Sequence, residues 1–333
     1  MNRPSIANVP SDLPIANVAR DLPIANVPWD LPLLLDDDAV RRHLSLDALL
    51  PAIEAALVDL SAGRVSQPLR TVLELPGPGS LLFVKPALTG HVLAAKLITQ
   101  VPDNAARGLP TMIATLLLLD PLTGVPLAVM DATWLTALRT AAVSAVATRA
   151  LRDRQPKRLA ILGSGALARS HALALRAVVP IGDIRVWSPT RAHAERCAAD
   201  VQGSASVDAE TAVRDADLVV TVTNASSPVL MGRWLKPGAL VHAVGAPRPA
   251  WRELDDDAMA NYVIADHRRA AETESGDVIL SGAPVRCEIG EVLAGKVKVP
   301  AGITIVFKAL GQAVEDAVAG RLVYDAATRQ AEP

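Results

Sequence analysis

A glycine-rich turn between an apolar run and an alanine-rich stretch constrains the fold of this chain more than any other feature. The apolar run RLAILG ends at Gly163. This glycine is also the first residue of a Gly-x-Gly-x-x-Ala motif, which ends at Ala168. In this motif the first glycine permits a tight turn, and the second lets a pyrophosphate approach the backbone. The small third residue lets helix and strand pack closely, and unpaired N–H groups at the helix start face the phosphates. The motif therefore predicts a dinucleotide-binding loop made by Gly163, Ser164, Gly165, Ala166 and Leu167.

The sequence after residue 157 alternates between short apolar runs and helical segments. The apolar runs read RLAILG, IRVWS, ADLVVTVT, GALVHAVG and NYVIAD. Strands that alternate with helices in this way form a parallel, doubly wound sheet. We therefore expect an α/β protein with a Rossmann-like, NAD(P)-binding domain over residues 135–302, and the glycine-rich turn follows its first strand.

The sequence before this region predicts an α+β domain. Helices are expected over DDDAVRRHL and LDALLPAIEAALVDLSAG, and turns separate the strands LRTVLEL, SLLFVKP, VLAAKLITQ, MIATLLLLD and PLAVMD. These strands predict a mostly antiparallel sheet, and the alanine-rich residues 132–152 predict a long helix that leads into the second domain. From residue 304, TIVFKALGQAVEDAVAGRLVYDAA is expected to form one amphipathic helix that docks back on the first domain. Residues 33–134 and 303–333 are therefore predicted to share one domain.

The start of the chain holds three tandem copies of one nine-residue unit. IANVPSDLP, IANVARDLP and IANVPWDLP occupy residues 6–32 without a gap. Because every copy contains proline, the unit cannot build a helix or a central strand. We expect residues 1–32 to form a flexible extension, and the alternative is an arm that lies along a partner subunit.

The bulk composition excludes several classes of partner. The net charge is −2, with both signs interspersed, and the absence of a basic stripe argues against nucleic acid. The apolar runs are too short to span a bilayer and no leader opens the chain, so we expect a cytoplasmic protein with no membrane partner. Two cysteines do not suggest a disulfide framework, and the six histidines include no pair at metal-ligand spacing, so no metal is expected.

The turn after the second strand of the predicted Rossmann-like domain bears on the choice of cofactor. An acidic residue there would bind the ribose hydroxyls of NAD, but RVWSPTRAH contains none. Ser188, Thr190 and Arg191 are predicted to bind a 2′-phosphate instead, with Arg191 neutralising its charge. We therefore expect NADPH, with NADH possible. The alternative is a solvated turn, with Arg191 belonging only to the next helix.

Long, ordered stretches from about Leu33 to the C-terminus resemble the ornithine cyclodeaminase/μ-crystallin family. They are QPLRTVL, AAKLIT, LLLLDPLTGVPLAVMDATWLTALRTAAVSAVAT, AILGSGALARSH, VTVTNASSPVL, LKPGALVHAVGAPRPAWRELDD, ESGDVILSGA and VFKALGQAVED. The resemblance is strongest to the μ-crystallin branch, which reduces cyclic ketimines with NAD(P)H. It implies a homodimer whose first domain carries the substrate pocket and the dimer surface. It also implies further cofactor contacts from Val222, Thr223, Val244, Gly245 and Leu310.

Three cations match family positions that face the substrate. They are Arg70 in PLRTV, Lys96 in AAKLI and Arg139 in ALRTAA. Taken alone, each is more typical of a solvated surface side chain. The resemblance implies that the two arginines bind the substrate carboxylate, since a planar guanidinium group can donate two hydrogen bonds to it. It also implies that Lys96 is the catalytic proton donor. We expect the neighbouring arginines to lower the pKa of Lys96.

Three departures from the family pattern bear on the reaction. Pro247 stands where the ornithine cyclodeaminases and alanine dehydrogenases of the family carry Asp, and Phe83 stands where cyclodeaminases carry Glu. Both departures argue against deamination, since neither side chain can move a proton. Lys85 stands where relatives have Met, and it is either a fourth cation near the pocket or an outward-facing side chain.

The sequence thus predicts an NAD(P)H-dependent ketimine reductase, an oxidoreductase that acts on C=N bonds. The expected substrates are the small cyclic imino acids Δ1-pyrroline-2-carboxylate and Δ1-piperideine-2-carboxylate, reduced to proline and pipecolate. The alternatives are an ornithine cyclodeaminase, which converts ornithine to proline and ammonia, an alanine- or opine-type dehydrogenase, and a non-catalytic NADPH-dependent ligand-binding protein.

Overall fold

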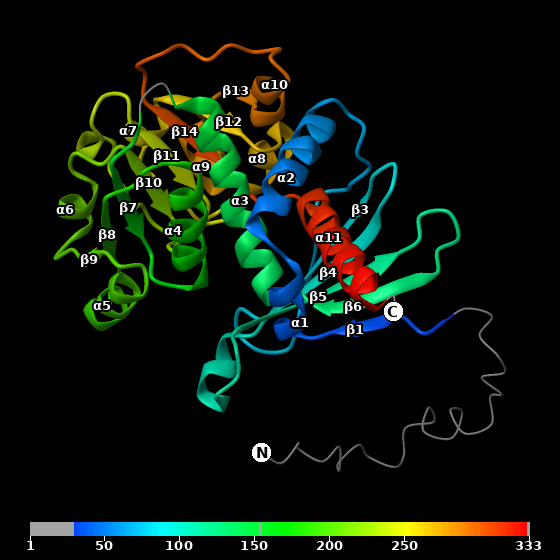
Figure 1. Ribbon diagram of the computed structural model, residues 1–333. Helices are drawn as coiled ribbons and strands as arrows, with labels where there is room; N and C mark the ends of the chain where they lie inside the picture. Colours follow the sequence, from blue (N-terminus) through cyan, green and yellow to red (C-terminus); the bar gives the residue numbers. More distant parts are fainter. Residues whose placement is uncertain (1–29, 153–154, 332–333) are drawn as a thin grey trace. The chain divides into compact units, whose positions relative to one another are not determined.

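The computed structural model describes residues 30–152 and 155–331. Residues Pro32–Pro333 form one compact unit, which contains two β-sheets (Figure 1). The predicted flexible extension, residues 1–32, falls almost wholly outside the described residues. Within the described residues, no helix is long and apolar enough to cross a membrane, and no three His, Cys, Asp or Glu side chains lie together as metal ligands.

The first sheet has six strands in the order β1-β6-β5-β4-β3-β2. Its strands are β1 (Leu33–Leu35), β2 (Thr71–Glu74), β3 (Leu81–Leu88), β4 (Leu93–Gln100), β5 (Met112–Leu119) and β6 (Pro126–Asp131). All neighbours are antiparallel except β1 and β6, so the prediction of a mostly antiparallel sheet is confirmed. Helix α11 (Ala313–Ala331) lies against β3, β4, β5 and β6 (Figure 1). The remaining elements before residue 132 are α1 (Asp37–His43), α2 (Leu46–Ser61) and a 3-10 helix, η1 (Pro102–Arg107).

The second sheet has eight strands, all parallel, in the order β13-β12-β14-β11-β10-β7-β8-β9. Its strands are β7 (Arg158–Leu162), β8 (Asp183–Trp187), β9 (Ser204–Ala205), β10 (Leu218–Thr221), β11 (Leu240–Ala243), β12 (Tyr262–Ala265), β13 (Val285–Glu288) and β14 (Ile305–Lys308). The intervening helices are α4 (Ala166–Val178), α5 (Arg191–Asp200), α6 (Ala209–Val213), η2 (Gly232–Trp234), α7 (Asp256–Met259), α8 (Arg268–Glu274), α9 (Gly276–Ser281) and α10 (Ile289–Leu293). This confirms the predicted α/β class and parallel sheet.

The order of the strands reverses at β7. The chain runs from β7 out to β8 and β9, and then returns so that β10 pairs with the other side of β7. Ligands of open α/β sheets bind at the carboxyl ends of the strands, at the point where the strand order reverses. The glycine-rich turn directly follows β7 and therefore lies at this point.

The segment from residue 304 differs from its prediction. It is not one helix, because Ile305–Lys308 form strand β14 between β11 and β12, with all four residues buried. Gly311, with φ of +71°, then interrupts the chain before α11 begins at Ala313. A short apolar run cannot be assigned to helix or strand by periodicity alone, and here burial between two parallel strands decided it. The chain therefore leaves the parallel sheet after Lys308.

Helix α3 (Thr133–Leu151) connects the two sheets and is buried on all sides. Every residue from Ala137 to Thr148 is buried. The helix packs against α2 and α11 on one part of its surface and against α4 and β11 on another (Figure 1). Its many alanines let these elements approach closely. Because α3 is enclosed by other elements, it has no solvent-facing polar side, unlike an amphipathic surface helix.

A close contact between α10 and α2 offers a test of the packing. A Cβ added at Gly290 would overlap the carbonyl oxygen of Leu57 and crowd the Ser61 hydroxyl. We expect Gly290→Ala to lower the free energy of unfolding by about 1–3 kcal/mol, because the helices must move apart. Gly182→Ala is the control, since a Cβ there has nothing within 4 Å and no positive φ to oppose it. Equal urea midpoints for the two variants would contradict this account.

Candidate active site

The glycine-rich turn has the geometry that its sequence predicts. Gly163 has φ of +125°, and a Cβ there would lie 2.6 Å from the carbonyl oxygen of Val222. Glycine at this position therefore lets the turn after β7 contact the turn after β10. Gly165 is the N-cap of α4 and makes no side-chain cap. Since a Cβ on Gly165 would meet nothing within 4 Å, the start of α4 has room for a phosphate group.

All the residues predicted to bind the cofactor lie at one edge of the parallel sheet. Each follows the carboxyl end of a strand, and in a parallel sheet those ends lie on the same side. Gly163–Leu167 follow β7, Ser188, Thr190 and Arg191 follow β8, Val222 and Thr223 follow β10, Val244 and Gly245 follow β11, and Leu310 follows β14. The structure thus brings together residues that are up to 147 positions apart in the sequence.

The turn after β8 presents polar groups beside the glycine-rich turn. The Ser164 hydroxyl donates a hydrogen bond to the Ser188 hydroxyl, at 3.0 Å. Thr190 is the N-cap of α5, and its side chain makes no capping hydrogen bond. Arg191 is exposed and forms an ion pair with Glu195 on the same helix, at 2.8 Å. Such an exposed pair is weak, so Arg191 can exchange this partner for another anion.

A buried polar network lies beneath this edge and was not predicted from the sequence. The Glu253 carboxylate accepts hydrogen bonds from the Thr223 backbone N–H and hydroxyl, both at 2.6 Å, and from the Thr221 hydroxyl at 2.7 Å. Lys308 Nζ donates to the Gly245 carbonyl at 2.7 Å and to Asp277 at 2.8 Å. These contacts fix the turns after β10 and β11 against β14.

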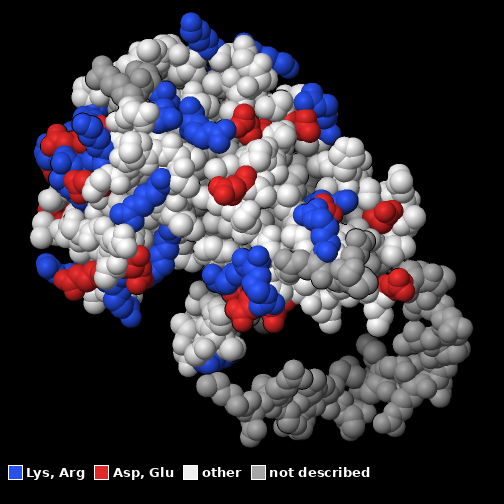
Figure 2. Space-filling model, in the orientation of Figure 1, with Lys and Arg blue, Asp and Glu red and all other residues white. Residues whose placement is uncertain are grey.

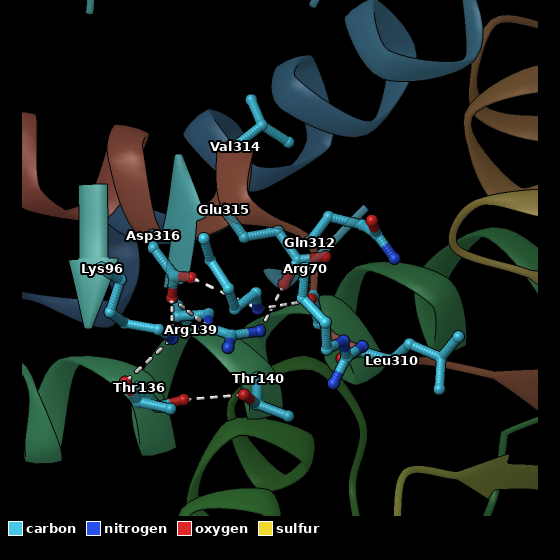
Figure 3. A network of polar contacts seen from close by, with 12 residues as sticks. Arg70, Lys96, Thr136, Arg139, Thr140, Leu310, Gln312, Val314, Glu315 and Asp316 are labelled. Carbon is cyan, nitrogen blue, oxygen red and sulfur yellow. Dashed lines mark hydrogen bonds and ion pairs between the residues drawn. The ribbon is translucent and has the colours of Figure 1, made fainter. Parts of the chain in front are cut away.

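Lys96 and Arg139 converge on carboxylates that the sequence reasoning had missed (Figure 3). Lys96 on β4 is fully buried, and its Nζ donates to Asp316 Oδ1 at 2.6 Å and to the Thr136 hydroxyl at 3.1 Å. Arg139 on α3 pairs with Glu315 at 2.6 Å and with Asp316 at 2.7 Å. Neither cation is a surface side chain. The acidic pair in AVEDAV, at the start of an apolar helix segment, was the available sequence signal.

Arg70 links the two sheets. It precedes β2, and its Nε donates to Glu274 Oε2 at 2.8 Å. Its NH2 group donates to the Leu310 carbonyl at 3.2 Å, so Arg70 reaches the turn after β14. The structure therefore brings Arg70 to the same turn, residues 309–312, that precedes Glu315 and Asp316.

Lys85 is an inward-facing cation, which decides between the two alternatives that the sequence left open. It lies directly opposite Lys96 in the pairing of β3 with β4, and it is 7% exposed. Its Nζ donates to the Gly311 carbonyl at 2.6 Å and lies 3.6 Å from Asp316 Oδ2. Phe83 lies two residues earlier on the same strand, and Pro247 lies in the turn after β11.

The cations and carboxylates of this cluster shift one another's pKa values. Burial lowers the pKa of Lys96 well below its ordinary value and Arg139 lowers it further, while Asp316 opposes both. Burial alone would raise the pKa of Asp316, but Arg139, Lys96 and Lys85 hold it below its usual range. Glu315 has less cationic support, and burial raises its pKa to about 7. A proton on Lys96 is therefore easier to release than one on an exposed lysine.

A small pocket opens beside this cluster. Its wall includes Arg70, Lys85, Glu274 and Gln312, together with residues Gln67–Leu69, His267, Arg269, Ala270, Gly311 and Ala313. Lys96 and Arg139 do not line it. The pocket thus presents Arg70 and Lys85 to a ligand, and the fully buried pairs of Asp316 lie beyond Lys85.

Comparison with known proteins identifies the family. The model of the ornithine cyclodeaminase/mu-crystallin family matches residues 32–331. The chain belongs to this family. It is 45% identical to the ketimine reductase mu-crystallin of Rattus norvegicus over 300 residues, which are 87% of this chain and 96% of the rat protein.

Two solved structures resemble this ornithine cyclodeaminase/mu-crystallin family member closely. Thermococcus litoralis Δ1-pyrroline-2-carboxylate reductase, in complex with NADH and L-proline, has a TM-score of 0.85 at 29% identity and covers 90% of this chain and 98% of its own. An archaeal alanine dehydrogenase dimer with bound NAD has a TM-score of 0.84 at 29% identity and covers 90% and 97%. These comparisons confirm the predicted family and fold.

The contribution of the Asp316 carboxylate to stability can be tested by substitution. We expect Asp316→Asn to lower the free energy of unfolding by about 3–5 kcal/mol, because it leaves Lys96 and Arg139 buried without their shared countercharge. Asp325→Asn, on the same helix, is the matched control. Its exposed pair with Arg321 should contribute about 0.5 kcal/mol or less. Similar urea unfolding curves for both variants would show that the buried charges do not depend on Asp316.

Proposed function

We propose that the protein reduces cyclic ketimines with NAD(P)H, converting Δ1-pyrroline-2-carboxylate and Δ1-piperideine-2-carboxylate to proline and pipecolate. The observation that carries the proposal is the buried cluster of Lys96, Arg139 and Asp316, which adjoins a pocket and the dinucleotide edge of the parallel sheet. The relatives support it, since one is a ketimine reductase and another is a pyrroline-2-carboxylate reductase solved with NADH and L-proline.

The turn after β7 fits a dinucleotide. A Cβ at Gly163 would overlap the Val222 carbonyl, whereas the uncapped start of α4 has open space beside Gly165. Gly163–Leu167 would hold the pyrophosphate, and the ends of β10, β11 and β14 would hold the other half of the molecule. Ser188, Thr190 and Arg191 would hold a 2′-phosphate, which favours NADPH over NADH. The bound dinucleotide supplies a hydride, so the remaining task of this chain is to position the imine and move one proton.

The cations divide that task between them. Arg70 and Arg139 bind the carboxylate of the imino acid, and their planar guanidinium groups fix the orientation of the imine carbon. Lys96 donates a proton to the imine nitrogen, which makes the imine carbon a better acceptor for the hydride. Asp316 is a positioning residue, because its carboxylate holds Lys96 Nζ at 2.6 Å and partly offsets the depression of its pKa.

The same arrangement opposes the lyase alternative. An ornithine cyclodeaminase must move several protons and release ammonia. Pro247 and Phe83, at the positions where cyclodeaminases are implied to carry acids, have no titratable group. Reduction needs one hydride and one proton, and Lys96 is sufficient for the proton.

The two sheets would divide binding and assembly. The eight-stranded part binds the dinucleotide, and the six-stranded part holds the imine and forms a homodimer. The face of the six-stranded sheet opposite α11 exposes apolar side chains on neighbouring strands. Among them, Leu97 is 38% exposed and Ile113 is 41% exposed. Apolar groups at adjacent positions of this kind suit a second copy of the chain. Elsewhere on the surface drawn in Figure 2, acidic and basic side chains are interspersed.

The proton donor is testable by substitution. We expect Lys96→Met to lower kcat for cyclic imines by about 10²–10⁴-fold, the usual contribution of a positioned acid, and to leave the Kd for NADPH essentially unchanged. The assay is NADPH oxidation with Δ1-pyrroline-2-carboxylate, with ammonia release from ornithine measured in parallel. A variant with full kcat, or wild-type protein that converts ornithine to proline with only catalytic NAD, would refute the proposal.

The cofactor preference has its own test. We expect Arg191→Ala to raise the Kd for NADPH by about tenfold and to leave that for NADH unchanged, since only NADPH has a 2′-phosphate. Arg196→Ala removes another exposed arginine of α5 and should change neither constant. Fluorescence titration of the wild-type protein and both variants measures all six dissociation constants. Equal affinity of the wild-type protein for the two cofactors would contradict this role for the turn after β8.

A further inference from the structure

Lys85 is a buried cation without a carboxylate of its own. The three other cations of the cluster each lie within 2.7 Å of a carboxylate oxygen: Arg70 of Glu274, Lys96 of Asp316, and Arg139 of Glu315 and Asp316. The hydrogen bond from Lys85 goes instead to a neutral group, the Gly311 carbonyl. Among the described residues its one ion-pair partner is Asp316 Oδ2 at 3.6 Å, and that carboxylate already serves two other cations.

The position of Lys85 makes its charge accessible to a ligand. It lines the small pocket beside the cluster, whereas Lys96, its neighbour across the strand pair, does not. His267 lines the same pocket, and its buried Nδ1 has no hydrogen-bond partner in the described part of the chain. A buried ammonium that lacks a full countercharge is costly, and an anion that enters the pocket would relieve that cost.

The remaining charges at the pocket do not remove this imbalance. Glu274 is paired with Arg70, and Asp266 accepts hydrogen bonds from the backbone N–H groups of Leu310 and Gly311. Arg269 on α8 adds another cation to the wall. A substrate whose single carboxylate is bound by the arginines, as proposed above, would leave Lys85 with only its long pair to Asp316.

We propose that Lys85 binds a second carboxylate of the substrate, so that the preferred imines are cyclic dicarboxylates. This inference rests on the proposed function and names the substrate class of the same pocket. Burial lowers the pKa of Lys85 to about 8, with Asp316 opposing the shift and Arg139 and Arg70 adding to it. The side chain is therefore mostly protonated at neutral pH, and a bound carboxylate stabilises that form.

A matched pair of substrates tests the assignment. Δ1-Piperideine-2-carboxylate and Δ1-piperideine-2,6-dicarboxylate differ by one carboxylate, and NADPH oxidation gives kcat/KM for each. We expect the wild-type protein to prefer the dicarboxylate by at least about tenfold, the value of one charge-assisted hydrogen bond. Lys85→Met should lower kcat/KM for the dicarboxylate by about 10–100-fold more than kcat/KM for the monocarboxylate.

Two control variants separate binding from folding. Lys85→Arg keeps the charge and should retain most of the preference for the dicarboxylate. Lys298→Met makes the same replacement at an exposed position between α10 and β14 and should change nothing. A purely structural role for Lys85, through its hydrogen bond to Gly311, would lower kcat/KM for both imines equally, and that result would overturn the proposal. So would a wild-type protein that shows no preference.

A binding measurement keeps this test separate from the test of the reaction. Pyridine-2-carboxylate and pyridine-2,6-dicarboxylate are aromatic analogues of the two imines that cannot be reduced in the same way. Calorimetric titration should show tighter binding of the dicarboxylate, by at least about tenfold, and loss of that difference in Lys85→Met. If neither imine is reduced but this difference is found, the proposed reaction fails and the anion site stands. Equal affinities would overturn the anion site whatever the reaction.

Discussion

The Asp316 carboxylate is the interaction on which the rest of the substrate side depends. It lies at the start of α11 and is shared by Lys96 from β4 and Arg139 from α3, so one side chain joins the helix, the sheet and the connecting helix. Buried charges are tolerated only when paired, and these three are 0–3% exposed. The arrangement therefore positions Lys96 and Arg139 together, and neither can move without leaving a buried charge unpaired.

The dinucleotide side depends on a different constraint, which is how closely backbones can approach. Gly163 brings the turn after β7 against Val222, while Glu253 and Lys308 hold the turns after β10 and β11 from beneath. The two sides meet at the turn of residues 309–312. Arg70 and Lys85 both donate to carbonyl groups of that turn, so the cations of the pocket also fix the end of β14. The proposed cofactor site and the proposed imine site are thereby joined by one turn.

Much of this could be read from local sequence. The alternation of apolar runs and helices indicated the parallel sheet, and the glycine motif indicated its first turn, because both depend on residues that are close in the chain. β14 was misassigned because its short run of three apolar residues and a lysine fits a helix or a buried strand equally well. Glu315, Asp316 and Glu253 were missed because their roles depend on partners that are at least 30 positions away. For Lys85 the sequence supplied two orientations, and the register of β3 with β4 selected one.

The sequence by itself determined the class of fold, the position of the glycine-rich turn and the identity of the cations. These properties follow from periodicity, from backbone conformations that only glycine adopts easily, and from motifs with a fixed spacing. Only the tertiary structure decided which charges are paired and which face the pocket. Pairing depends on the distance between atoms that folding brings together. Lys96 and Lys85 therefore differ in their surroundings, because Lys96 is enclosed with a carboxylate and Lys85 borders the pocket.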